Sequence, residues 1–166
     1  MTAPIITSVE IQATPSEVFQ FATVAANWKR WHPATISVSG NVHRSAMPGE
    51  TIDEKIRVGW YRGTARWTVR QRRAPSTAHE GRWVIEGRAD NGGTARIVYV
   101  LASEKGGTRF TRSLTYTTPN RFYAWLDRLF MHRLLVRQSE RALGQLKRVM
   151  ESSARYSPDD SLIQPS

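Results

Sequence analysis

Apolar and polar positions alternate at the start of the chain, which predicts a half-buried β-strand over residues 5–13. Thr14, Pro15 and Glu17 then form the pattern of a capping box, the usual start of a helix. Apolar residues follow at helical spacing, and the segment WKRWH (28–32) predicts a further short helical turn that a proline ends. The chain therefore opens with one strand and two short helices.

The pattern then changes to short runs rich in β-branched and aromatic residues, separated by glycine, proline, asparagine or aspartate. Such runs are typical of strands joined by tight turns, and the turns DNGG (90–93) and EKGG (104–107) suit hairpins. We therefore expect an antiparallel meander. Its six predicted strands cover residues 35–42, 50–60, 63–72, 79–88, 94–103 and 108–117.

Apolar residues recur three and four positions apart in the last part of the chain, which predicts one helix from Asn120 to about Ser152. At 1.5 Å per residue this helix is about 45 Å long, enough to cross most of a sheet. Residues 153–166 are polar and contain proline, and we expect them to form a flexible tail. One domain over residues 1–152 accounts for the rest.

An antiparallel sheet with one buried face needs an apolar body to cover it, and the long helix is the one of suitable size. The expected fold class is therefore α+β, with about seven strands wrapped around a C-terminal helix. A strongly twisted sheet leaves space beside such a helix, and that space is the expected ligand cavity.

This order of elements resembles the START-like helix-grip (SRPBCC) superfamily, in its polyketide cyclase/dehydrase and lipid-transport branch. The resemblance covers residues 4–152 and depends mainly on the opening segment ITSVEIQATPSEVFQFATVAANWKRWHP, with its W-x-x-W-x-P motif, and on two GGT hairpins. It implies the helix-grip fold and a site for small apolar ligands. Some members of the superfamily close aromatic rings or dehydrate polyketides, whereas many have no assigned activity.

Strand periodicity places two charged residues on otherwise apolar faces. Glu54 shares its face with Ile52 and Ile56, and Arg112 shares its face with Phe110 and Leu114. Buried charges are seldom left unpaired because their desolvation is costly. The two side chains therefore either pair inside the cavity, with each other or with a ligand, or lie in water at an open end of the sheet.

His79 falls in phase with Trp83 and joins Glu54 and Arg112 as a candidate acid–base or oxyanion-binding group. The other candidates are aromatic and aliphatic residues on inward faces, which either form the core or bind a planar, aromatic or isoprenoid ligand. These candidate ligand-binding residues are Trp28, Trp31, Ile56, Trp60, Trp67, Trp83, Ile85, Tyr116, Leu126 and Phe130.

The spacing of Trp28 and Trp31 puts both rings on one side of a helical turn, where we expect them to cover the cavity as a lid. Lys29 and Arg30 then lie toward water. His32 precedes a proline, and we assign it to the turn rather than to chemistry.

Composition narrows the classes of function. The 166 residues include no cysteine, which excludes disulfides, thiol nucleophiles and thiolate zinc sites. No signal peptide or membrane-spanning stretch is evident, so a cytoplasmic location is expected. The net charge of +10 comes from scattered basic residues without a long run, and we expect no nucleic-acid partner.

The sequence supports binding of a small hydrophobic ligand, either as a carrier or by sequestration. The alternative is a cyclase/dehydrase-type enzyme, which needs only a shaped cavity and one or two polar groups. No metal or cofactor is expected, since no ligand spacing or nucleotide-binding motif occurs. Arg133, Arg137 and Arg141 follow one another every four residues on the long helix, which is typical of a solvated face or of transient contact with an anionic membrane. A monomer and a homodimer are both compatible with the chain.

Overall fold

The computed structural model describes residues 3–59, 61–117 and 132–154. Its elements follow the predicted order of one strand, short helices, six strands and a long helix. They are β1 (Ile5–Ile11), α1 (Pro15–Thr23), the 3-10 turn η1 (Ala25–Asn27), α2 (Trp28–Trp31), β2 (Thr35–Gly40), β3 (Thr51–Val58), β4 (Tyr61–Arg73), β5 (Gly81–Ala89), β6 (Thr94–Glu104), β7 (Gly107–Thr117) and α4 (His132–Ala154).

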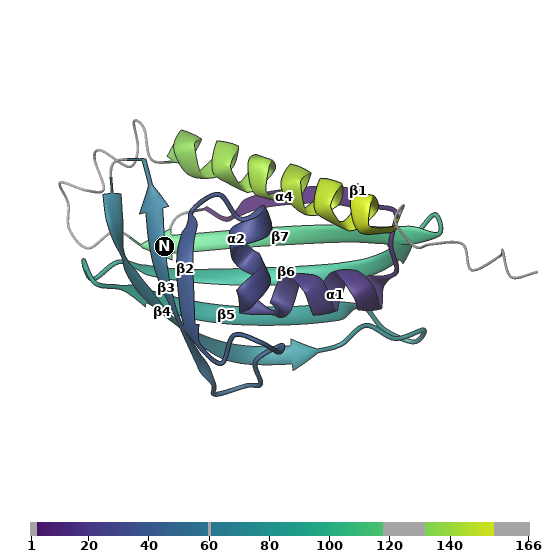
Figure 1. Cartoon of the computed structure of the whole chain (residues 1–166), viewed down its shortest axis with the longest axis horizontal. Helices are drawn as coiled ribbons and strands as arrows, with labels where there is room; N and C mark the ends of the chain where they lie inside the picture. Colours follow the sequence, from purple (N-terminus) through teal and green to yellow (C-terminus); the bar gives the residue numbers. More distant parts are fainter. Residues whose placement is uncertain (1–2, 60, 118–131, 155–166) are drawn as a thin grey trace, which may run out of the picture.

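All neighbouring strands are antiparallel and form one seven-stranded sheet in the order β1-β7-β6-β5-β4-β3-β2. Helix α4 lies along β1, and α1 and α2 lie over the same face of the curved sheet (Figure 1). The predicted α+β architecture, a sheet wrapped around a C-terminal helix, is confirmed. Helix α4 extends to Ala154, two residues into the predicted tail of 153–166. The predicted helix start at Asn120 and the rest of the predicted tail, residues 155–166, lie outside the described residues.

The predicted capping box starts α1. The Glu17 backbone N–H donates to the Thr14 hydroxyl oxygen, and the Thr14 N–H donates to the Glu17 carboxylate at 2.9 Å. Helical spacing predicts a first helix over residues 15–27, but the helix ends at Thr23, because Val24 is extended and pairs with Ser45. The chain then turns through η1 into α2.

A β-bulge in β4 corrects one part of the predicted pattern. The register between β4 and β5 shifts between Val69 and Gln71, so the alternation of faces reverses beyond that point. Regular alternation in this strand predicts that Arg72 points outward together with Arg66 and Arg70. Instead Arg72 lies opposite Trp83, and its guanidinium lies 5.5 Å from the centre of the Phe19 ring. The strand bends at the bulge and brings a cation over the end of α1.

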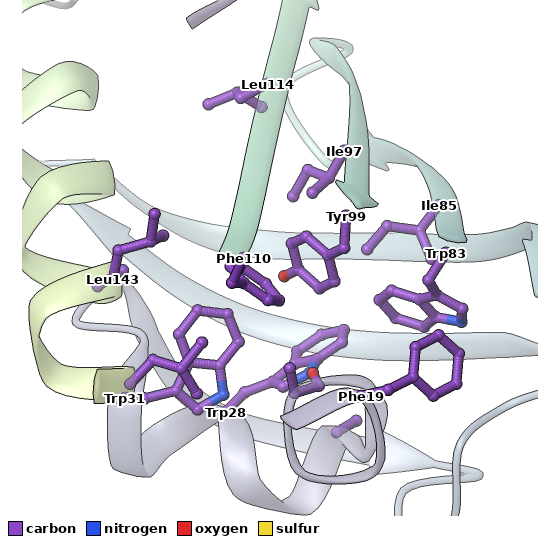
Figure 2. Packing of buried hydrophobic residues seen from close by; sticks show 14 of the residues in the cluster. Phe19, Trp28, Trp31, Trp83, Ile85, Ile97, Tyr99, Phe110, Leu114 and Leu143 are labelled. Carbon is purple, nitrogen blue, oxygen red and sulfur yellow. The ribbon is translucent and has the colours of Figure 1, made fainter. Parts of the chain in front are cut away.

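An aromatic cluster fills the space between α2 and the sheet (Figure 2). Its members are Trp28 and Trp31 from α2, Trp83 from β5, Tyr99 from β6 and Phe110 from β7. Trp83 stacks on Tyr99 with ring centres 5.5 Å apart, and Trp31 meets Tyr99 edge-on at 6.1 Å. These contacts bury α2 and fix its position on the sheet.

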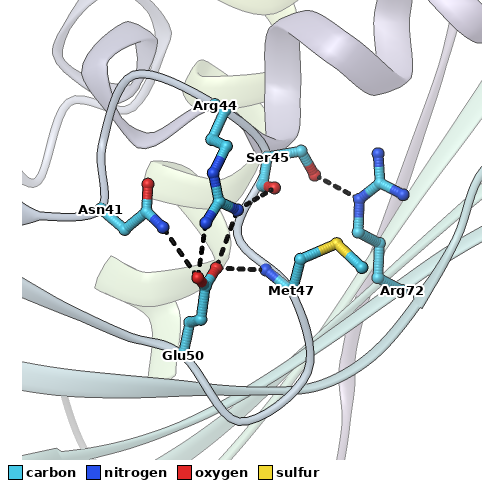
Figure 3. Close-up of polar contacts among 6 residues, drawn as sticks. All are labelled: Asn41, Arg44, Ser45, Met47, Glu50 and Arg72. Carbon is cyan, nitrogen blue, oxygen red and sulfur yellow. Dashed lines mark hydrogen bonds and ion pairs between the residues drawn. The ribbon is translucent and has the colours of Figure 1, made fainter.

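The loop between β2 and β3 is held by the Glu50 carboxylate, which accepts hydrogen bonds from Arg44, from Asn41 and, at 2.6 Å, from the Met47 backbone N–H (Figure 3). The Ser45 hydroxyl oxygen in the same loop accepts one hydrogen bond from Thr23 and one from Arg72. The loop is thereby tied to both α1 and β4.

We expect Gly87→Ala to destabilise the protein by about 1–3 kcal/mol. Gly87 lies opposite Trp67 across β4 and β5, and a Cβ at this position would lie 2.5 Å from Cε3 of the Trp67 ring. Urea unfolding measures the effect. The control is Gly144→Ala in α4, where a Cβ has no neighbour within 4 Å and should instead stabilise the helix. Equal effects of both substitutions would contradict the packing of Trp67 on Gly87.

Candidate functional site

A cavity of about 510 Å³ lies between the sheet, α2 and α4. Strands β3 to β7 supply most of its wall, and Leu135, Gln138 and Ser139 of α4 complete the described part. The exposed lining residues Arg62 and Asn91 belong to the β3–β4 and β5–β6 hairpins, and we call this end of the cavity the mouth. The aromatic cluster lies at the other end, which we call the inner end.

The structure brings six of the candidate ligand-binding residues to the cavity wall: Trp28, Trp31, Ile56, Trp67, Ile85 and Tyr116. Trp83 is fully buried in the aromatic cluster and does not line the cavity. Trp60, Leu126 and Phe130 lie outside the described residues. The role of the lining residues in binding a ligand stays a prediction.

The position predicted for His79 is wrong. Strand β5 begins at Gly81, and His79 lies in the preceding loop, where its exposed ring contacts the Ser76 hydroxyl. Strand alternation does not extend into that loop, so phase with Trp83 carries no information about the direction of the His79 side chain.

The position expected for Trp28 and Trp31 also changes. Both rings line the cavity, yet both are buried in the aromatic cluster at the inner end, with Trp31 fully inaccessible to solvent. Lys29 and Arg30 are exposed, as predicted. In this position the two tryptophans form the floor of the cavity, at the end away from its mouth.

Glu54 lies inside the cavity, with only 3% of its surface exposed. One carboxylate oxygen accepts a hydrogen bond from the Thr35 hydroxyl, and the other accepts one from Trp67 Nε1 at 2.8 Å. Burial raises the pKa of Glu54, while the two hydrogen bonds and the charge of Arg112 act in the opposite direction. The alternative that Glu54 lies in water at an open end is wrong.

Arg112 is equally buried, with 3% of its surface exposed, and also lines the cavity. Its Nη1 donates to the Ser139 hydroxyl at 2.7 Å, and its Nη2 lies 3.4 Å from His32 Nε2. Its Nε–H has no acceptor among the residues that the structure describes. Among the described residues no ion pair joins Arg112 to a carboxylate, so direct pairing with Glu54 is wrong as well.

His32 connects the two charged residues, a role that the sequence did not indicate. Its backbone serves the turn after α2, as predicted, since its N–H donates to the Trp28 carbonyl at 2.7 Å. Its side chain nevertheless lines the cavity, with Nδ1 3.3 Å from the Thr35 hydroxyl. Burial, aided by the charge of Arg112, lowers the pKa of His32 to about 3, so the ring is neutral at pH 7.

The chemistry of the partners sets the direction of this hydrogen-bond chain. A guanidinium only donates, so His32 Nε2 accepts from Arg112 and Nδ1 carries the ring proton. Nδ1–H then donates to Thr35, whose hydroxyl donates to Glu54. We call this series the polar chain; it runs from Arg112 through His32 and Thr35 to Glu54.

Tyr99 adds a phenol beside the polar chain. It lies directly opposite Arg112 in the register of β6 and β7, and its side chain lines the cavity. Burial raises the pKa of Tyr99 to about 12, although the Arg112 charge acts to lower it. The hydroxyl therefore stays protonated at neutral pH and is available as a hydrogen-bond donor.

Four polar residues of the site were missed: His32, Thr35, Tyr99 and Ser139. The inward direction of Tyr99 and Ser139 could have been predicted from the sequence pattern. Tyr99 is in phase with Ile97 and Leu101, and Ser139 falls at helical spacing from the buried residues Ala142 and Leu143. His32 ends a short helical turn, and Thr35 begins a strand whose register shifts directly after it, so periodicity assigned neither side chain; only the folded chain brings them together.

The arginines of α4 lie on its exposed side: Arg133, Arg137 and Arg141 are all exposed. Their contact with an anionic membrane stays a prediction. Within the described part of the chain, no helix combines the length and apolar character needed to cross a bilayer.

We expect His32→Gln to reduce the loss of stability in acid. The folded protein holds the ring neutral to about pH 3, whereas the unfolded chain takes up the proton near its ordinary pKa of 6.5. The folded state therefore loses stability as pH falls below 6.5, by up to about 1.4 kcal/mol per pH unit. Urea unfolding from pH 7 to pH 4 should show a shallower slope in the variant. His79→Gln, at an exposed position, is the control, and parallel slopes in wild type and His32→Gln would contradict a buried neutral ring.

The chain is similar to known proteins in sequence and in fold. A sequence profile of the family described as polyketide cyclase/dehydrase and lipid transport matches residues 3–151. Comparison with curated proteins gives no match. A START superfamily protein from Mycobacterium smegmatis has a similar structure, with a TM-score of 0.66 at 11% identity over 90% of this chain and 98% of that chain.

Two further structures are similar. The protein jhp0584 from Helicobacter pylori gives a TM-score of 0.70 at 9% identity, over 89% of this chain and 88% of its own. DynU16, a protein of the dynemicin biosynthetic locus, gives 0.60 at 15% identity, over 92% of this chain and 49% of its own. These likenesses confirm the START-like helix-grip fold. Together with the profile match along nearly the whole sequence, they show that the chain belongs to the polyketide cyclase/dehydrase and lipid transport family.

Proposed function

We propose that this protein binds a small hydrophobic ligand in the cavity between the sheet and α4, as a carrier or by sequestration. The observation that carries the proposal is the cavity itself, a space of about 510 Å³ walled mainly by apolar and aromatic side chains. Protein interiors otherwise pack almost without voids larger than a water molecule. A space of this size falls in the range of small-molecule sites.

The composition of the wall supports a ligand with a flat or flexible apolar body. Trp67 and Tyr116 present ring surface, while Ile56, Ile97 and Leu114 present branched aliphatic surface. Burial of a ligand against this wall is worth about 25 cal/mol for each Å² of apolar surface removed from water. The family's association with lipid transport supports the same class of ligand.

Cyclase/dehydrase-type catalysis is the second candidate, and the polar chain is the observation that favours it. Burial raises the pKa of the Glu54 carboxyl, and a carboxyl group in the cavity wall can exchange a proton with a bound ligand. A buried guanidinium stabilises negative charge that develops on an oxygen. The structurally similar protein DynU16 belongs to a biosynthetic locus, which is compatible with an enzymatic role. At 15% identity the likeness itself shows the fold alone.

We expect Ala65→Leu to weaken binding of decan-1-ol, a neutral apolar probe, by about 10-fold or more because the added atoms occupy the cavity. Ala65 is buried and lines the wall. Trp28, Trp31 and Trp67 line the same space, so intrinsic tryptophan fluorescence reports ligand entry. The control is Thr64→Leu, which adds the same side chain on the exposed face of β4. Unchanged decanol affinity in Ala65→Leu would argue against the cavity as the binding site.

We expect that, if the protein is an enzyme, Glu54→Gln lowers turnover of a linear poly-β-ketone thioester about 100-fold or more while the substrate still binds. The amide keeps the shape of the carboxyl group but exchanges no proton. Product formation by mass spectrometry and binding by tryptophan fluorescence are measured on the same samples. If the wild type retains the thioester stoichiometrically without converting it, the result favours the carrier function. If Glu54→Gln still converts the thioester at the wild-type rate, Glu54 takes no part in the reaction.

A further inference from the structure

The buried guanidinium of Arg112 has no anionic partner in the described chain. An arginine side chain keeps its positive charge at any pH at which the protein is folded. The described groups that it contacts, the Ser139 hydroxyl, the protonated Tyr99 phenol and the neutral ring of His32, carry no charge. An uncompensated buried charge costs several kcal/mol, so this arrangement is expensive for the folded protein.

Two exposed arginines of the same sheet, in contrast, have carboxylate partners. Arg66 pairs with Asp53 at 2.7 Å, and Arg70 pairs with Glu86 at 2.8 Å, both near the protein surface. Exposed ion pairs of this kind add little stability. Among the described residues, carboxylates thus pair with arginines near the surface, where a partner adds little stability. None of them forms an ion pair with Arg112, where burial makes a partner most valuable.

Glu54 does not fill this role. It is the one carboxyl among the described lining residues, but its two oxygens already accept hydrogen bonds from Thr35 and Trp67. His32 and Thr35 lie between Glu54 and Arg112 in the polar chain. Burial also shifts Glu54 toward its neutral form.

We propose that the ligand of this cavity is a carboxylic acid with an apolar body, and that Arg112 binds its carboxylate. This inference rests on the proposed ligand-binding function and names the class of ligand. The carboxylate supplies the charge that Arg112 lacks, and among the described residues the Arg112 Nε–H has no acceptor. The Nε1–H of Trp31 is a second buried donor without an acceptor in the described part of the chain, and Trp31 also lines the cavity.

The position of Arg112 sets the orientation of the ligand. Arg112 lies opposite Tyr99, next to the aromatic cluster at the inner end, whereas Leu114 and Tyr116 follow on β7 toward the mouth. These two residues and Ile97 give the wall beyond Arg112 an apolar surface. The acid therefore enters headgroup first, with its carboxylate at the inner end and its apolar body directed toward the mouth.

The test compares ligands with the same chain and different headgroups: decanoate, methyl decanoate and decan-1-ol. At pH 7.5 we expect the wild type to bind decanoate about 10-fold or more tightly than either neutral ligand. In Arg112→Gln this preference should fall to about 2-fold or less, because decanoate loses its charged partner and decanol no longer leaves a buried charge unpaired. Arg112→Met is a second variant with a side chain suited to the apolar wall, which guards against a folding defect in one substitution. Tryptophan fluorescence and calorimetry give the affinities.

Arg62→Gln is the matched control because Arg62 also lines the cavity but lies exposed at the mouth. It should leave the preference for decanoate unchanged. If Arg62→Gln removes the preference, the assignment to Arg112 is overturned. Equal binding of all three ligands by the wild type overturns the acidic headgroup but leaves the hydrophobic site intact. If none of the three binds, the proposed function itself fails.

Discussion

The aromatic cluster between α2 and the sheet is the contact on which the site depends. Trp31 is fully buried against Tyr99 and Phe110, and this packing fixes the short helix that carries it. The next residue is His32, whose ring lies edge-on to Trp31 with centres 5.6 Å apart. The position of the imidazole in the cavity is therefore set by core packing. The geometry of the polar chain therefore depends on the packing of Trp31 in the aromatic cluster.

The same cluster explains why polar groups converge beside it. Tyr99 and Phe110 belong to neighbouring strands, and Arg112 follows Phe110 on the inward face of β7. A charge placed next to packed aromatic rings is cut off from water, which strengthens each of its interactions and makes a missing partner costly. Burial favours the neutral form of the three titratable groups near Arg112. It raises the pKa of Glu54 and of Tyr99 and lowers the pKa of His32.

Sequence periodicity was sufficient for the fold and for the inward direction of the two buried charges. Glu54 and Arg112 face the cavity because strand alternation is strict as long as the ladder is regular. It failed at Arg72, beyond a bulge, and at His79, outside a strand, since both positions break that regularity. His32 and Thr35 could not be assigned, because their meeting with Glu54 depends on how α2 packs, which no local pattern encodes. The burial of Trp28 and Trp31 at the inner end of the cavity could not be predicted for the same reason.

The proposed acid ligand also accounts for how the cavity would select its ligand. The apolar wall would supply most of the binding free energy in proportion to buried area, and it would discriminate weakly among molecules of similar size. Under this proposal Arg112 adds the discrimination. A neutral ligand that fills the cavity leaves the charge of the guanidinium unpaired, whereas an acid pairs with it through a charge-assisted hydrogen bond. Selectivity for the headgroup would thus come from a penalty already present in the folded chain, which a matching anion removes.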